Sequence, residues 1–144
     1  MRMAMIEAER AFRRNEVPVG AILVDGATGG VVAASGNRVE ELGDPTAHAE
    51  MLVIREAAAR VGAARLPGYD LYVTLEPCAM CAAAISFARI RRLYFGAYDA
   101  KGGAVEHGPR FFEFSTCHHR PQVCGGVEEI AAQDMLRAFF RGKR

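Results

Sequence analysis

Apolar residues recur three or four positions apart in three segments of the chain, which is the spacing of one helix face. The segments span residues 2–14, residues from about 46 to 61, and residues 126–141. Thr46 is the predicted N-cap of the second segment, and Gly62 lies near its end, where glycine is favoured. The pattern predicts three helices that each bury one face.

Runs rich in β-branched and aliphatic residues predict strands between these helices. The runs at 17–26 and 29–37 are separated by glycines typical of a turn, which indicates a hairpin. Further strands are predicted at 70–77 and 91–98.

A short apolar helix is predicted over residues 78–88, between the last two strands. Pro77 ends the strand before it and suits the first turn of a helix. The alternation of strands and helices indicates an α/β fold in which helices cover both faces of one sheet. Residues 99–125, rich in glycine and aromatic residues, predict no regular element.

The composition is that of an ordinary globular protein. The 144 residues are 51% hydrophobic and 24% charged, which fits one domain over residues 1–144. The first helix alternates Glu and Arg where a signal peptide would be apolar, and no apolar run reaches the length of a membrane span. We therefore expect a soluble, cytoplasmic protein that does not enter a membrane.

The net charge of +1 excludes a general attraction of the chain to nucleic acid, but its last segment is basic. The residues LRAFFRGKR place four cations around Phe139 and Phe140. The helix dipole favours cations near a helix C-terminus, which would account for them. Basic residues beside aromatic ones also bind single-stranded RNA. Composition alone favours the first interpretation.

Two of the four cysteines, Cys78 and Cys81, lie three positions apart at the start of a predicted helix. Nothing indicates the secretory context in which disulfides form. Both side chains point the same way from one helical turn, and the helix dipole favours their thiolate forms. Two adjacent thiolates favour a zinc ion.

His48 is the third candidate ligand of this zinc ion. It lies at the start of another predicted helix, and helices that follow strands of one parallel layer begin at the same edge of the sheet. A structural zinc site has four protein ligands, whereas a catalytic site has three and leaves one position to water. The remaining ligand-type residues lie in the irregular segment without matching spacing and are interpreted as loop residues: Cys117, His118, His119 and Cys124.

Glu50 lies in the apolar stretch PTAHAEMLVI, where a carboxylate is costly without a partner. Two residues after His48, it faces another side of the helix, so we do not expect it to be a ligand. It can reach the water in the open metal position, accept its proton and pass it on. A core histidine, a redox CxxC pair or a Glu–Arg pair would each explain one feature. Only the zinc site explains them together.

The pattern H-x-E followed by P-C-x-x-C is the signature of zinc-dependent deaminases, in which the glutamate is acid and base and not a ligand. Further matching stretches are NEVPVGAILV, GNR, DPTAHAEM, LYVTLEPCAMC, RIRRLYFGAYDAKGGA and LRAFFR. Together they resemble the bacterial tRNA-specific adenosine deaminase family over nearly the whole chain.

The resemblance implies a cytidine deaminase-like, three-layer α/β/α fold around a five-stranded mixed sheet, and a homodimer. It also implies conversion of adenosine to inosine at the wobble position of a tRNA anticodon, with one zinc ion per subunit. Matched by position, His48, Cys78 and Cys81 would bind zinc, and Glu50 would be the catalytic proton shuttle.

The resemblance also implies the substrate contacts. Asn37 would hold the flipped nucleoside, the backbone N–H of Ala49 would meet the base edge, and Val19 would line the pocket. The contacts to the anticodon stem-loop would fall on Asp99, Lys101, Phe140, Arg141 and Arg144.

Other functions stay open on the sequence. A deaminase of a free base or nucleoside, such as guanine, cytosine or cytidine, would use the same zinc chemistry. The DAKGG stretch and the basic, aromatic C-terminus favour RNA over such a substrate. A non-catalytic RNA-binding or partner subunit with a structural zinc would have no use for Glu50. A zinc-stabilised scaffold would need a fourth protein ligand, and the sequence offers none with matching spacing.

Overall fold

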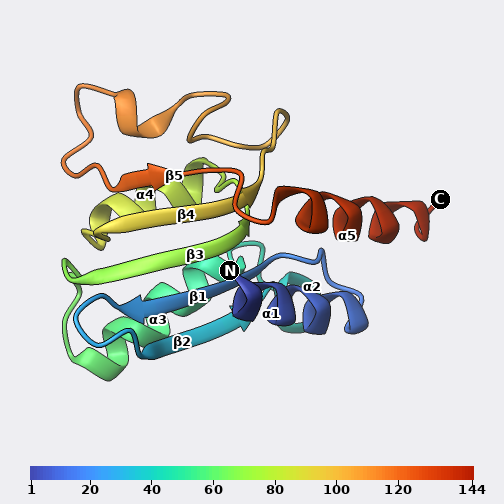
Figure 1. The fold of residues 1–144 in the computed structure, drawn as a ribbon, viewed down its shortest axis with the longest axis horizontal. Coiled ribbons are helices and arrows are strands. Elements are labelled where there is room, and N and C mark those ends of the chain that lie inside the picture. The colour runs from blue at the N-terminus through green and yellow to red at the C-terminus, as the bar shows by residue number, and fades with distance from the viewer.

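A five-stranded mixed sheet in the order β2-β1-β3-β4-β5 forms the centre of the computed structural model, which describes every residue of the chain (Figure 1). β1 (Gly20–Asp25) and β2 (Val31–Gly36) form the predicted antiparallel hairpin, and β1 also pairs antiparallel with β3 (Tyr69–Leu75). β4 (Arg92–Ala97) and β5 (Gln122–Cys124) continue the sheet in parallel with β3. The expected mixed sheet is confirmed.

Helices cover both faces of this sheet (Figure 1). α1 (Arg2–Arg13) contacts β1 and β2, and α5 (Glu129–Arg141) contacts β4 on the same side. α3 (Ala49–Val61) and α4 (Ala79–Phe87) contact each other on the opposite face. A Cβ on Gly20 would overlap the backbone of α1, so glycine is required where this helix crosses β1. The three-layer α/β/α arrangement is confirmed.

The main core lies between the sheet and the pair α3 and α4. Alternate residues of the central strands point into it, and six of them have no exposed surface: Ala21, Leu23, Leu71, Val73, Leu93 and Phe95. This period of two is the one expected of strands that bury one face. The core holds the helices of the candidate site rigidly against the sheet.

The start of α3 differs from the prediction. Thr46 is not its N-cap, because the Thr46 hydroxyl donates to Asp44 Oδ1 at 2.7 Å in the turn before the helix. The N-cap is His48, with extended backbone, and the helix begins at Ala49. A four-residue helix that the pattern did not predict, α2 (Val39–Leu42), precedes this turn.

The segment over residues 99–125 is mostly irregular, but it contains a 3-10 turn, η1 (Phe111–Glu113), and the edge strand β5. All three residues of β5 are exposed, so no burial pattern marks the strand, and its pairing with β4 holds it in place. α5 begins at Glu129, later than predicted, because Gly126 and Glu128 have positive φ angles of 81° and 58°.

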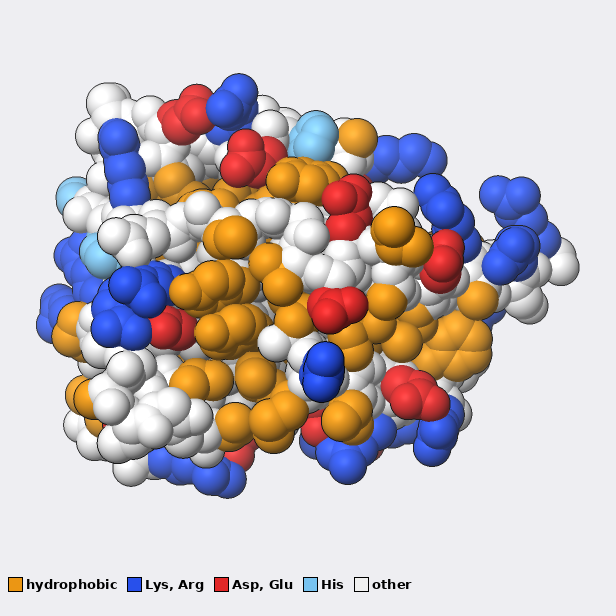
Figure 2. All heavy atoms as spheres, in the orientation of Figure 1, with side chains coloured by type: hydrophobic (Ala, Val, Ile, Leu, Met, Phe, Trp, Pro, Cys, Tyr) orange, Lys and Arg blue, Asp and Glu red, His pale blue; other side chains and the backbone are white.

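α1 and α5 leave part of their sheet face uncovered, and hydrophobic side chains gather there (Figure 2). Ile22, Val24 and Tyr72 line a shallow depression on this face. Tyr72 stacks on Tyr94 of the next strand, with ring centroids 4.5 Å apart. None of the helices has the combination of length and hydrophobicity that crossing a membrane requires.

Candidate active site

The N-termini of α3 and α4 meet at one edge of the sheet and bring the three candidate ligands together. His48 is the N-cap of α3, Cys78 is the N-cap of α4, and Cys81 lies in the first turn of α4. From the sequence, we expect these helices to follow strands of one parallel layer. In the structure the strands that precede them, β2 and β3, are not paired with each other. They run in the same direction because each pairs antiparallel with β1, and the helices therefore begin at the same edge.

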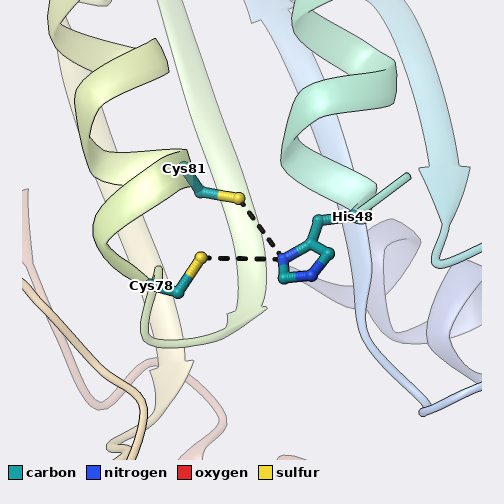
Figure 3. Close-up of side chains that lie close together, drawn as sticks. All are labelled: His48, Cys78 and Cys81. Atoms are coloured by element: carbon teal, nitrogen blue, oxygen red, sulfur yellow. Dashed lines mark hydrogen bonds between the residues drawn. The ribbon is translucent and has the colours of Figure 1, made fainter. Parts of the chain in front are cut away.

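The three side chains fit a zinc ion. His48 Nδ1 lies 3.7 Å from Cys78 Sγ and 3.6 Å from Cys81 Sγ (Figure 3). Tetrahedral zinc, with Zn–S near 2.3 Å and Zn–N near 2.0 Å, separates such ligand atoms by roughly 3.6 Å. No fourth His, Cys, Asp or Glu joins this group, whose ligand atoms lie within 4.8 Å of one another. Three protein ligands are the number typical of a catalytic zinc site.

The electrostatics of the two thiols favour a cation. The adjacent Cys81 thiol, together with the His48 ring and the Cys81 N–H, lowers the pKa of Cys78 to about 4. The interaction with Cys78 and the burial of the side chain raise the pKa of Cys81. The pair therefore carries one negative charge, and a second thiolate needs a positive partner.

Glu50 lies in the first turn of α3 and is 4% exposed. Burial raises the pKa of Glu50 to about 7, although the nearby His48 opposes the shift. The side chain lines the same cavity as His48 and Cys78, yet it is outside the group of candidate ligands. It is a carboxyl group that can take up and release a proton near neutral pH beside a metal site.

A cavity of about 840 Å³ extends from these residues to the end of α5. Four of the expected substrate contacts line it: Val19, Asn37, Asp99 and Phe140. The expectation for the Ala49 N–H differs from the structure, because this N–H donates to Asn37 Oδ1 at 2.8 Å and is not free to face a base. Ala49 instead orients the amide of Asn37.

A neighbouring groove of about 860 Å³ shares Asp99 and Phe140 with this cavity. It is also lined by Lys101 and Arg144, two further residues of the expected RNA contacts. Arg141 is exposed near the end of α5 and lines neither space. The cavity and the groove together form one continuous depression with the zinc group at one end.

Sequence reasoning missed several lining residues. Lys143 lines both spaces, and its place in the LRAFFRGKR segment was the available signal. Glu16 and Glu76 line the cavity as buried carboxylates, and no spacing connects them to the zinc motif.

The four ligand-type residues of the late segment do not join the zinc group. The Cys117 thiol donates to the His119 carbonyl oxygen at 3.1 Å, and His119 Nε2 lies 2.6 Å from the Ile90 carbonyl oxygen. Their interpretation as loop residues is confirmed except for Cys124, which belongs to β5.

A family model for the zinc-binding region of cytidine and deoxycytidylate deaminases matches residues 1–97. With the three-ligand site, this match defines the chain as a zinc-dependent deaminase. Over 144 residues the chain is 62% identical to the tRNA-specific adenosine deaminase of Agrobacterium fabrum and covers 93% of that protein. It is 43% identical to that of Bacillus subtilis and covers 88% of it. The chain belongs to the tRNA-specific adenosine deaminase family.

Solved structures agree with this assignment. One from a study of A-to-I editing by deaminases at the wobble position of transfer RNA superposes with a TM-score of 0.91 at 61% identity, covering 94% of this chain and 96% of that chain. A guanine deaminase from Nitrosomonas europaea superposes with a TM-score of 0.77 at 22% identity, covering 94% of this chain and 80% of that chain. At that identity the second likeness concerns the fold alone.

Proposed function

We propose that this protein hydrolyses adenosine to inosine at the wobble position of a tRNA anticodon. One observation carries the proposal: two members of the zinc group, His48 and Cys78, line a cavity together with the buried Glu50, and this cavity continues into a groove with basic and aromatic residues. A deaminase of free bases or nucleosides has no need of such a groove, so that alternative is not favoured.

The chemistry requires a nucleophile and a proton shuttle. His48, Cys78 and Cys81 would hold a zinc ion, which would supply Lewis acidity and lower the pKa of a bound water to about 7. Glu50 accepts a proton from the attacking water and donates it to N1 of adenine, which makes C6 electrophilic. After the water oxygen adds to C6, Glu50 takes the proton of the new hydroxyl group and passes it to the amino group, so that the C6–N bond breaks, ammonia leaves and the C6 carbonyl of inosine forms.

The cavity walls suit a flipped nucleoside. Because Asn37 Oδ1 accepts from the Ala49 N–H, the amide NH2 of Asn37 is left to donate to the substrate. The apolar side chain of Val19 lines the same cavity. A nucleotide of an RNA loop enters such a pocket at lower cost than a paired one.

The groove suits the nucleotides that flank the target. Phe140 is 50% exposed and offers a face on which a neighbouring base can stack. Lys101 and Arg144 line the same groove and can pair with phosphates. These contacts add binding energy that a free nucleoside cannot supply.

The position of the product in a full-length tRNA tests the proposal. The zinc-loaded protein is incubated with a tRNA that has adenosine at the wobble position. Inosine is then located by reverse transcription and sequencing, because reverse transcriptase reads inosine as guanosine. Inosine is expected at that position alone, and none with the Glu50→Gln variant. Its absence, or inosine at other loop adenosines at a similar rate, would refute the proposal.

We also propose that the protein acts as a homodimer in the cytoplasm, where its tRNA substrate is found. Phe87 at the end of α4 is a large apolar side chain with 69% of its surface exposed, which a contact between subunits would cover. Analytical ultracentrifugation is expected to show twice the 15.6 kDa mass of one chain. A monomer at micromolar concentration would contradict the dimer.

A further inference from the structure

A second buried carboxylate, Glu76, lies beside the site but takes no part in the chemistry described above. It follows β3 and directly precedes Pro77 and the zinc ligand Cys78. The side chain of Glu76 has 0% of its surface exposed to solvent. Its carboxylate therefore cannot contact a nucleotide in the cavity without a rearrangement.

The carboxylate of Glu76 accepts hydrogen bonds from one loop only. Oε1 accepts from the backbone N–H groups of Val105, Glu106 and His107 at 3.2, 2.8 and 3.0 Å. Oε2 accepts from the Asp99 N–H at 2.9 Å and lies 2.9 Å from His107 Nδ1. These five contacts saturate the acceptor capacity of a carboxylate, which has about four lone-pair sites.

The loop formed by residues 99–107 is wrapped closely around this carboxylate. A Cβ on Gly103 would lie 2.6 Å from Glu76 Cδ, so only glycine permits the approach. The Gly103 N–H donates to the Asp99 carbonyl oxygen at 2.9 Å, and Asp99 Oδ1 accepts from the Lys101 N–H at 3.0 Å. The two expected RNA contacts of the loop, Asp99 and Lys101, are thus placed by a backbone that Glu76 holds.

We propose that Glu76 is a positioning residue, whose carboxylate fixes the loop of residues 99–107 and so holds Asp99 and Lys101 against the RNA. The inference rests on the proposed function and deepens it. A buried carboxylate that served only stability could bond to any nearby donors, but all its partners belong to the loop that borders both cavity and groove. RNA binding then depends on a residue that does not touch RNA.

The charge of Glu76 suits this role. Both of its oxygens accept backbone N–H groups, Oε1 from residues 105–107 and Oε2 from Asp99, so a proton on either oxygen would meet a donor. The side chain is therefore an acceptor at both oxygens. A neutral side chain of the same shape would lose acceptor capacity at one of the two positions.

The Glu76→Gln variant tests the proposal with little change in shape. If the amide oxygen of the glutamine side chain replaces Oε1 and accepts from the N–H groups of Val105 to His107, the NH2 group replaces Oε2. The NH2 group then faces the Asp99 N–H, and two donors oppose each other. We expect KM for an anticodon stem-loop to rise roughly tenfold, the effect of losing one hydrogen bond to a charged group. We expect kcat to change by less than about threefold, since Glu50 and the zinc ligands are untouched. One zinc per chain should remain.

Two variants serve as controls. His107→Ala removes one of the donors to Glu76 and is expected to raise KM less than Glu76→Gln does. Asp70→Asn alters a buried carboxylate at the start of β3, which Arg91 binds at 2.7 and 2.9 Å and which lies at the far end of the strand from Glu76. It is expected to lower the melting temperature without changing KM. Hydrogen exchange gives an independent readout, since the loop amides should exchange faster in Glu76→Gln than in the wild type.

The possible results separate the inference from the proposed function. An unchanged KM in Glu76→Gln, a loss of zinc, or an equal rise of KM in Asp70→Asn would each overturn the positioning role. A wild-type protein that does not deaminate the stem-loop would overturn the proposed function and the RNA part of the inference. Faster exchange of the loop amides in Glu76→Gln would, even then, support Glu76 as the residue that orders the loop.

Discussion

Replacing Glu50 by glutamine should separate the chemistry of the site from its metal. Glutamine has nearly the same shape but cannot take up a proton. The mechanism uses Glu50 in successive proton transfers, each worth about 10²–10⁴-fold, so kcat is expected to fall by at least about 10³-fold. Zinc content should stay at one per chain, because Glu50 is outside the ligand group. Single-turnover deamination of a stem-loop and metal analysis of the same preparation measure both quantities.

The same substitution should stabilise the metal-free protein at alkaline pH. Burial raises the pKa of Glu50 from 4.5 to about 7. Below pH 4.5 the carboxyl group is protonated in both the folded and the unfolded state. Folding then buries a neutral group, and this group adds no pH dependence to the stability. As pH rises from 4.5 to about 7, the carboxyl group ionises in the unfolded state but stays protonated in the folded state, so stability falls over this range and levels off above it. The loss amounts to about 3 kcal/mol at pH 8, which Glu50→Gln would remove.

Chemical unfolding of metal-free wild type and Glu50→Gln between pH 5 and pH 8 measures this difference. The variant is expected to gain stability over the wild type as pH rises. Near-normal deamination by Glu50→Gln would refute the role of Glu50 as proton shuttle. Loss of zinc in the variant would show that Glu50 is a ligand, and equal stability curves would contradict the cost of its burial.

Three further predictions follow from the site. Cys81→Ala leaves two zinc ligands and is expected to abolish zinc binding and lower the melting temperature, as measured by metal analysis and calorimetry; full zinc content would argue against its role as a ligand. Asn37→Ala leaves the buried Ala49 N–H without its acceptor and should cost about 1–3 kcal/mol in urea unfolding, together with a higher KM. Phe140→Ala and Arg144→Ala should each raise KM for the stem-loop, and only Arg144→Ala should reduce the salt dependence of binding; equal salt slopes would contradict a phosphate contact.

The regular elements that carry the site could be predicted because their patterns are local. The helix over residues 78–88 was marked by Pro77 and an apolar run, and α4 spans Ala79–Phe87. The strand predicted over residues 70–77 corresponds to β3, which spans Tyr69–Leu75. The spacing of Cys78 and Cys81 sets their common direction through helix geometry alone. Cys78 and Cys81 lie close to His48 because the two helices that carry these residues begin at the same edge of the sheet.

The elements that could not be predicted depend on contacts between distant segments. β5 has three exposed residues and no periodicity, and it exists as a strand because β4 offers a free edge. The loop of residues 99–107 has a defined shape because Glu76 accepts its backbone N–H groups. The sequence does not show which backbone N–H groups bind a given side chain. Neither the shape of the loop nor the role of Glu76 could therefore be predicted from it. The engagement of the Ala49 N–H by Asn37 was hidden for the same reason.

A comparison of kcat/KM for ammonia release by the zinc-loaded protein distinguishes a tRNA deaminase from a deaminase of free bases or nucleosides. The substrates are an anticodon stem-loop with adenosine at the wobble position, the same stem-loop with guanosine there, and free adenosine, guanine and cytosine. We expect turnover of the first substrate alone, because only that substrate fills both the cavity and the groove with adenosine at the zinc group. Turnover of a free base or nucleoside at a comparable or higher kcat/KM would contradict this expectation.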